Sequence, residues 1–152
     1  MEVHDQRVPD ETYARFLELM PQVCVELVLE YDEGLLLTKR TQEPAKGEWF
    51  WPGNRLYKGE RLEEAANRLG REELGIEVVL EQQLGVYEHF WDESAAEGRP
   101  SRHTVNVVFL AQASDDEKPS LDHQHSEYRF IDTVEPDLHE YVRQYITENN
   151  IL

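Results

Sequence analysis

The chain has 152 residues, of which 39% are hydrophobic and 31% charged, so it can bury a core and lacks the composition of a disordered protein. Its 32 acidic residues against 15 basic ones give a net charge of −17, which argues against nucleic acid and anionic membranes as partners. The single cysteine, Cys24, excludes an internal disulfide, and its place in an apolar run predicts a buried, inert thiol.

The first third of the sequence predicts a helix, a β-hairpin and a loop. Apolar residues at helical spacing predict a helix over residues 10–20, behind an Asp10 cap. An alternating strand, a turn and a second apolar run predict a hairpin over residues 22–40. Residues 41–54 are rich in Pro and Gly and predict a loop that crowds three aromatic side chains together.

The rest of the chain predicts a mixture of helices and strands. Two amphipathic helices are expected over residues 59–75, with Gly75 as the C-terminal cap, and over residues 138–150. Strands are expected at residues 76–91, 104–113 and 128–133, separated by two polar loops. A mixed sheet with helices packed on it follows, which is the α+β class, and we expect residues 1–152 to form one domain.

The distribution of charge and the first residues predict where the protein works. The acidic residues are spread along the whole chain, which is typical of proteins from salt-accumulating microbes. Residues 1–13 are polar and acidic, unlike a signal peptide, and the apolar runs are too short to cross a bilayer. We therefore expect a cytoplasmic protein that works at high salt.

A loop followed by a helix brings together oxygen ligands. Gly53 can expose a backbone carbonyl, and Glu72 and Glu73 lie near the end of the predicted helix. Two carboxylates beside a carbonyl form a set of hard oxygens suited to Mg²⁺, which substrate phosphates usually complete. Arg68 lies four residues before Glu72, so an ion pair on the helix surface explains Glu72 equally well.

The segment "GNRLYKGERLEEAANRLGREELGI" resembles the Nudix box, over about residues 54–76. The positions that match are Asn54 at the first glycine, Glu60, Arg68, the pair Glu72 and Glu73, Gly75 and Ile76. The resemblance implies a Nudix-like α/β/α sandwich with a central mixed sheet and the box as loop–helix–loop. It also implies a divalent metal, Mg²⁺ with Mn²⁺ as the alternative, and a Glu60 that is tied to the box arginine.

Three residues depart from the box pattern. Asn54 replaces a glycine, Leu69 replaces the glutamate after the box arginine, and Gly70 replaces an aliphatic residue. A leucine can be neither ligand nor base, so the chemistry must differ from the usual attack on phosphorus, or the protein is silent. Glycine costs about 1 kcal/mol in a helix interior, so Gly70 predicts a close backbone approach.

A wider resemblance covers roughly residues 23–132. Residues 39–75, "GVYEHFWD" and "DHQHSEYRF" are similar to GDP-mannose mannosyl hydrolases, a Nudix branch that also has a hydrophobic residue after the box arginine. Enzymes of that branch attack C1 of the sugar with inversion and release GDP and free mannose. The resemblance therefore implies a nucleotide sugar as the small-molecule partner.

The same resemblance implies a metal site and a base. Gly53 through its carbonyl, Glu73 and Gln124 would bind Mg²⁺, with Glu72 as a further candidate ligand where the branch usually has Ala. His125 would be the general base that takes a proton from water, and an unperturbed pKa of about 6.5 suits that task.

It also implies contacts to the substrate. Arg40 and Arg55 would contact the diphosphate and stabilise the charge that develops on the leaving group. His89 and Glu26 would belong to the substrate pocket. Thr104 stands where the branch usually has a tyrosine, so the exact substrate stays open.

Two alternatives remain at this point. A Nudix pyrophosphohydrolase that cuts a nucleoside diphosphate derivative at phosphorus is favoured by Glu72. A catalytically silent nucleotide-sugar sensor is favoured by Asn54, Leu69 and Gly70. The closing helix is explained by core packing, with a homodimer contact as the alternative.

Overall fold

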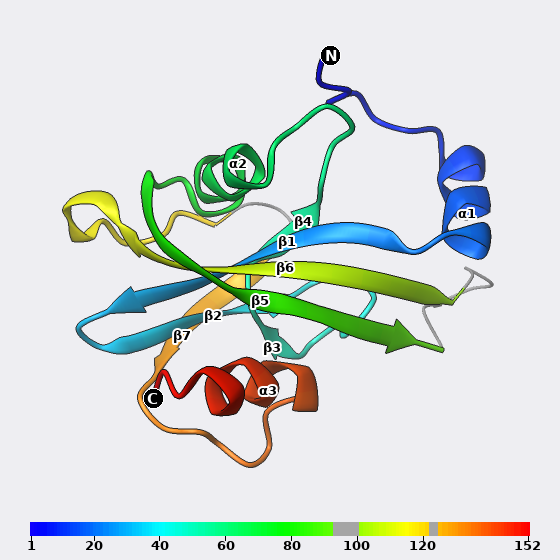
Figure 1. Cartoon of the computed structure of the whole chain (residues 1–152). Coiled ribbons are helices and arrows are strands. Elements are labelled where there is room, and N and C mark those ends of the chain that lie inside the picture. Colours follow the sequence, from blue (N-terminus) through cyan, green and yellow to red (C-terminus); the bar gives the residue numbers. More distant parts are fainter. Residues whose placement is uncertain (93–100, 122–124) are drawn as a thin grey trace.

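The computed structural model describes residues 1–92, 101–121 and 125–152, and for residues 125 and 126 the backbone only (Figure 1). The elements in chain order are α1 (Asp10–Leu19), β1 (Gln22–Tyr31), β2 (Gly34–Arg40), β3 (Trp49–Phe50), β4 (Gly53–Arg55), α2 (Leu62–Leu74), β5 (Val78–Trp91), β6 (Arg102–Ala113), a short 3-10 turn (Ser114–Asp116), β7 (His125–Ile131) and α3 (Glu140–Asn149). No helix in these ranges is long and apolar enough to cross a membrane.

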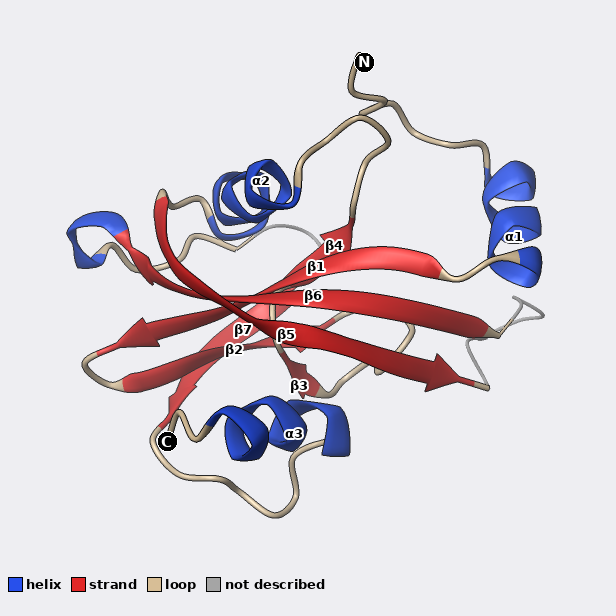
Figure 2. Ribbon diagram, in the orientation of Figure 1, coloured by secondary structure: helices blue, strands red, loops and turns tan. Residues whose placement is uncertain are grey.

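The strands form one mixed sheet between two helices. Its main path runs β3-β2-β1-β6-β5, while β4 pairs with β1 and β7 pairs with β2. β1 and β6 are parallel, and the other pairs are antiparallel. α2 covers one face, α3 covers the opposite face, and α1 lies where β1 and β6 begin (Figures 1 and 2). This arrangement confirms the predicted α/β/α sandwich.

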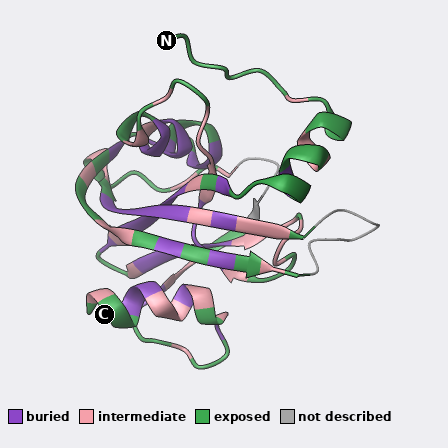
Figure 3. Cartoon of the chain, turned by 45° about the vertical axis from the view of Figure 1, so that its right-hand side comes forward, coloured by how far each residue is buried: buried purple, intermediate pink, exposed green. Residues whose placement is uncertain are grey.

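Two apolar clusters hold the layers together, one on each face of the sheet. Leu69 and Leu74 of α2 pack in the first cluster with Val25, Leu27 and Leu29 of β1. The α3 side chains Val142, Tyr145 and Ile146 pack in the second with Val28 of β1. Successive strand residues point to opposite faces, so β1 serves both clusters and is buried along most of its length. Figure 3 shows buried residues in the strands and in the helices on both faces of the sheet, whereas α1 is largely exposed.

Local chemistry explains the bounds of α2. At its start the Arg61 N–H donates to the Glu64 carboxylate at 2.8 Å, which satisfies an otherwise unpaired backbone donor. At its end Gly75 has φ +64°, a left-handed conformation that glycine adopts without strain, as the sequence predicts. Inside the helix, a Cβ on Gly70 would lie 2.9 Å from Val78 Cγ1. This contact confirms the predicted close approach at Gly70.

The observed elements differ from the predicted ones mainly where they are short. The predicted loop over residues 41–54 contains β3 and β4, because strands of two or three residues are too short to show a periodic pattern. β7 starts three residues earlier than residue 128. Pro9, not Asp10, caps α1, and Leu17 is the one residue of α1 that is buried.

Candidate active site

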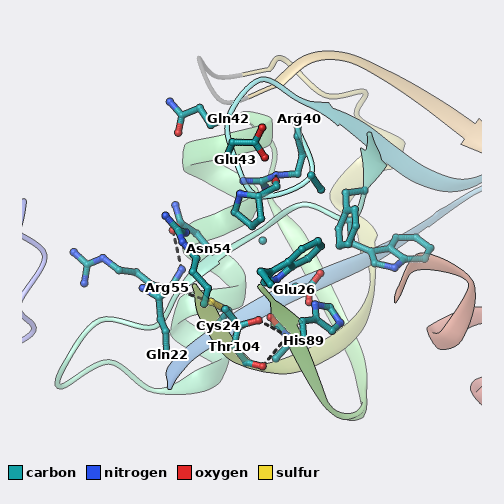
Figure 4. Close-up of a pocket in the computed structure, with 18 of the residues that line it drawn as sticks. Gln22, Cys24, Glu26, Arg40, Gln42, Glu43, Asn54, Arg55, His89 and Thr104 are labelled. Carbon is teal, nitrogen blue, oxygen red and sulfur yellow. Dashed lines mark hydrogen bonds between the residues drawn. The ribbon is translucent and has the colours of Figure 1, made fainter. Parts of the chain in front are cut away.

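A pocket of about 350 Å³ is lined by residues of β1, β2, β4, β5 and β6 (Figure 4). Five of the predicted site residues line it: Glu26, Arg40, Gly53, Arg55 and His89. They come from β1, β2, β4 and β5, so the sheet brings together side chains that are far apart in the sequence. In the close-up, Arg40 lies on one side of the pocket and Glu26 and His89 lie on the other.

Glu73 joins this site through β4. The side-chain amide of Asn54 donates to Glu73 Oε1 at 3.0 Å, and only 2% of the Glu73 surface is exposed. The negative charge of Glu73 also interacts with Arg40 and acts to raise the pKa of that guanidinium. Asn54, which replaces the box glycine, therefore holds the buried carboxylate beside the lining residue Gly53.

The backbone of β4 presents the Gly53 carbonyl. Leu27 N–H donates to Pro52 O and Leu56 N–H donates to Val23 O, both at 2.9 Å. Because hydrogen-bonded and non-hydrogen-bonded pairs alternate along an antiparallel ladder, Gly53 opposite Glu26 points its carbonyl away from β1. A Cβ at Gly53 would lie 2.6 Å from Glu26 Cγ, so this position needs glycine.

These donors fit a hard divalent cation. The carbonyl of Gly53 and the carboxylate of Glu73 are oxygen ligands of the kind that Mg²⁺ prefers. Across the described ranges, no three His, Cys, Asp or Glu side chains form a complete metal cage. A partial oxygen set suits Mg²⁺, which keeps several waters and takes oxygens from substrate phosphates. Gln124, the third predicted ligand, lies outside the described residues.

Glu60 is part of the scaffold of the box. Arg68 Nε donates to Glu60 Oε1 at 2.6 Å, and Arg68 Nη2 donates to Glu60 Oε2 at 3.0 Å. The same guanidinium donates to the Arg55 carbonyl at 3.0 Å and lies over the Tyr57 ring at 3.8 Å. This bidentate pair ties the box loop to α2, as the resemblance implies for Glu60 and the box arginine.

Glu72 differs from its neighbour in both exposure and partners. The Glu72 side chain is 58% exposed and forms an ion pair with Arg68 at 3.4 Å. Neither glutamate is a lining residue of the pocket, but only Glu73 accepts a hydrogen bond from the lining residue Asn54. The structure therefore separates the two adjacent glutamates, and metal binding by Glu72 stays a prediction.

Four arginines line the pocket. Arg40 Nε donates to the Pro44 carbonyl at 2.8 Å, and Arg55 lies over the Tyr57 ring at 4.4 Å. Burial lowers the pKa of Arg40, while Glu73 and Glu26 oppose that shift. Arg7 and Arg102 also line the pocket, and the sequence did not single them out.

The base of the pocket is a buried hydrogen-bonded group. Tyr145 Oη donates to Glu26 Oε1 at 2.7 Å and lies 2.9 Å from His89 Nε2. Burial raises the pKa of Glu26 to about 7, against the effects of the Tyr145 hydrogen bond and Arg40. Burial, with a smaller effect of His139, lowers the pKa of His89 to about 3, so the imidazole is neutral near pH 7.

Sequence reasoning missed Tyr145. Its helical spacing in the closing helix is that of a core residue, and the structure does bury it completely. Only its hydroxyl, which reaches residues of β1 and β5, has a second role. No signal within the helix could reveal that contact.

The predicted base lies at the edge of the same region. The backbone of His125 begins β7 and pairs with Arg40 across the β2–β7 ladder. Its side chain lies outside the described residues, so the role of His125 stays a prediction. Cys24 also lines the pocket and is half-buried, not buried as predicted. Desolvation still raises the pKa of its thiol to about 12, which agrees with the expectation of an inert thiol.

Comparisons with known proteins agree with this geometry. Residues 20–147 match the NUDIX domain. Low-salt glycan biosynthesis protein Agl8 of Haloferax volcanii is 39% identical over 140 residues, which cover 92% of this chain and 89% of that protein. ADP-ribose pyrophosphatase of Methanocaldococcus jannaschii is 36% identical over 94 residues, or 62% of this chain and 52% of that protein. The crystal structure of a MutT NUDIX hydrolase from Burkholderia pseudomallei has a TM-score of 0.66 at 29% identity and covers 84% of this chain and 97% of that one.

Proposed function

Since this chain belongs to the Nudix hydrolase family, we propose that it hydrolyses a nucleotide sugar at C1 of the sugar, with GDP-mannose as the leading substrate. Water adds to C1, the bond from C1 to the diphosphate oxygen breaks, and the products are GDP, free hexose and a proton. The observation that carries the proposal is that a single pocket is lined by arginines, by Gly53 and by Asn54, which holds Glu73, and by a buried acid beside a neutral histidine.

The arginine side of the pocket accounts for the diphosphate. Arg40 and Arg55 place two permanent positive charges on a protein whose net charge is −17. Guanidinium groups bind phosphate oxygens through paired hydrogen bonds, and partial burial strengthens that interaction. They stabilise the negative charge that develops on GDP as it leaves.

The metal site adjoins that side. Gly53 through its carbonyl, Glu73 and Gln124 hold Mg²⁺ in this proposal, with Glu72 as a further candidate and Mn²⁺ as the alternative ion. When bound, the metal neutralises negative charge on the departing diphosphate. Asn54 orients Glu73 for this purpose through the hydrogen bond at 3.0 Å.

The base of the pocket accounts for the sugar. Glu26 and His89 offer an acidic and a neutral polar group, and Trp51 lines the same pocket. The indole N–H of Trp51 is buried and has no hydrogen-bond partner among the described residues. An acidic and a neutral polar group can both bond the hydroxyls of an uncharged ligand, which supports a hexose at this end.

His125 is the base in this proposal. It takes the proton from the attacking water, while the Leu69 position contributes no carboxylate. Leu69 is fully buried in the apolar cluster beneath α2, so its role is packing. Attack at carbon uses a base outside the box, so it is consistent with a leucine in place of the box glutamate at position 69.

A second candidate is hydrolysis at phosphorus. The relative from Methanocaldococcus jannaschii is an ADP-ribose pyrophosphatase, and Glu72 retains the acidic pair of the box. That reaction would release a nucleoside monophosphate and a sugar phosphate. A silent nucleotide-sugar sensor would bind the same ligand and release nothing.

One experiment separates these functions. The protein is incubated in high-salt buffer with Mg²⁺ and GDP-mannose in ¹⁸O-water, with the Glu73→Gln variant as the control. Free mannose that carries the label, released first as the β anomer, is the expected result. Label in GMP or in mannose 1-phosphate would place the attack on phosphorus. Binding without any product, repeated over a panel of nucleotide sugars, would support the sensor.

A further inference from the structure

Tyr145 lies behind the pocket and contacts two residues that line it. Its side chain is fully buried on α3, and it is not itself a lining residue. Its hydroxyl is 2.7 Å from Glu26 Oε1 on β1 and 2.9 Å from His89 Nε2 on β5. One hydroxyl group therefore connects both polar residues at the base of the pocket.

The hydroxyl has only one proton to donate, which sets the direction of both hydrogen bonds. At pH 8, above the Glu26 pKa of about 7, the ionised carboxylate can only accept, so the Tyr145 proton lies on the bond to Glu26. The Tyr145 oxygen must then accept from His89, which requires the neutral imidazole to carry its proton on Nε2. Nδ1 of His89 is left as a hydrogen-bond acceptor.

Ring packing holds the hydroxyl in place. The Tyr145 ring stacks on Trp51 with centroids 6.1 Å apart and on His89 at 5.8 Å. The Tyr87 ring is tilted against it, with centroids 4.4 Å apart. Because these neighbours are largely buried, the phenol has little freedom to turn away from Glu26.

We propose that Tyr145 is a positioning residue that joins Glu26 and His89 into one hydrogen-bonded unit and selects the Nε2–H tautomer of His89. It orients the carboxylate and the imidazole that meet the sugar. That last role rests on the proposed function, whereas the hydrogen-bond arrangement does not.

Tyr141 offers a matched control on the same helix. Its ring stacks directly on His89, with centroids 4.0 Å apart and planes within 1°. Its hydroxyl instead contacts the backbone of Phe90, at 3.0 Å from N and 3.2 Å from O. Tyr141→Phe and Tyr145→Phe each remove one hydroxyl and keep a ring against His89, but only the second breaks the Glu26–His89 connection.

The first test is ¹⁵N NMR of protein labelled at histidine, at pH 8 and high salt, with His89 assigned by its absence in His89→Gln. We expect a protonated Nε2 and an unprotonated Nδ1 for His89 in the wild type and in Tyr141→Phe. Tyr145→Phe should shift both signals toward a mixture of tautomers. An Nδ1–H tautomer in the wild type, or an unchanged spectrum in Tyr145→Phe, would overturn the proposal.

The NMR measurement needs no substrate. It therefore tests the hydrogen bonds of Tyr145 with Glu26 and His89 even if nucleotide sugars are not hydrolysed. The wild-type tautomer alone is decisive if Tyr145→Phe does not fold. With an active substrate in hand, Tyr145→Phe should lower kcat/KM about tenfold or more, mainly through KM, because a charged acceptor loses its donor. Tyr141→Phe should stay within about twofold, and equal effects of the two variants would contradict the positioning role.

Discussion

Glu72 and Glu73 are neighbours in the sequence with the same side chain, and the fold gives them different chemistry. Glu73 is 2% exposed, accepts a hydrogen bond from Asn54 and interacts with the charge of Arg40. The Glu72 side chain is 58% exposed and pairs with Arg68. Successive helix residues point about 100° apart, so adjacent carboxylates need not share a site.

Replacement of Glu73 tests the metal site. Glu73→Gln keeps the size and the hydrogen bond to Asn54 but removes a charged ligand, so Mg²⁺ affinity should fall about tenfold or more. Titration with Mg²⁺ by calorimetry, or with Mn²⁺ by electron paramagnetic resonance, measures this. Glu72→Gln is the matched control and should have a smaller effect. A larger effect from Glu72 would move the metal to the exposed side of α2.

Replacement of His89 tests its protonation state. Its folded-state pKa of about 3 lies below the unfolded value of 6.5, so unfolding takes up a proton between these values. Its contribution to stability is complete above pH 6.5 and is lost as pH falls toward 3. His89→Gln, which does not titrate, should therefore lose about 1.6 kcal/mol less than the wild type between pH 6.5 and pH 5.

Urea unfolding at the two pH values, at constant high salt, gives this difference. The half-buried His103, replaced as His103→Gln, serves as a control for the loss of a histidine as such. Equal pH dependence in the wild type and His89→Gln would mean that His89 is not held neutral.

At the scale of elements, α2 shows how a helix can be adapted to its neighbours. Two of its departures from the box pattern, Leu69 and Gly70, face inward. Leu69 packs in the cluster with β1, and Gly70 allows Val78 to approach the helix backbone. Both substitutions are therefore explained by packing between α2 and the sheet.

Gly70→Ala tests that close approach. Alanine improves the intrinsic helix free energy by about 1 kcal/mol, but its Cβ would lie 2.9 Å from Val78 Cγ1 and 3.1 Å from the Ile76 carbonyl. Overpacking of this kind costs about 1–3 kcal/mol, so the net effect should be a destabilisation. Chemical denaturation measures the free energy of unfolding. In a Val78→Ala background the penalty should shrink, and a stabilised single variant would refute the contact.

Leu69→Glu tests whether the glutamate of the box pattern can be restored at this position. Its side chain would enter the apolar cluster, where a carboxyl group without partners costs a few kcal/mol. We expect a fall in the free energy of unfolding of about 3 kcal/mol or more, measured by denaturation, and no gain of activity at phosphorus. Leu69→Met, similar in volume, should cost less than about 1.5 kcal/mol. A stable Leu69→Glu variant that gains hydrolysis at phosphorus would show that residue 69 can still take part in catalysis.

At the scale of the whole molecule, charge is distributed unevenly. The net charge is −17, yet Arg7, Arg40, Arg55 and Arg102 all line the pocket. Asp10, Glu26 and Glu43 also line the pocket, so its lining is far less negative than the rest of the surface, which repels other polyanions. Dispersed carboxylates also repel one another and destabilise the folded state when salt is low.

Stability should therefore depend strongly on salt. Raising KCl from about 0.1 M to 2 M shortens the screening length from about 10 Å to less than 3 Å and should raise the melting temperature by about 10 °C or more. Thermal unfolding followed by circular dichroism measures this, with sucrose as a control for effects unrelated to charge. Full stability in low-salt buffer would count against adaptation to high salt.

The sequence by itself determined the features whose signals are local. Helical spacing and Gly75 located α2, and the intact spacing of the box identified the family and predicted Glu72 and Glu73 as candidate metal ligands. The hairpin of β1 and β2 followed from apolar alternation and a turn. Such patterns need only interactions between residues close in the chain, so they can be read without coordinates.

Only the tertiary structure decided how distant parts meet. β3 and β4 exist through pairing with other strands, and Glu72 and Glu73 differ through what surrounds α2. The junction of Tyr145 with Glu26 and His89 joins α3 to β1 and β5. The physical reason is that hydrogen bonds and burial between remote segments depend on three-dimensional packing, which leaves no periodic trace in either segment.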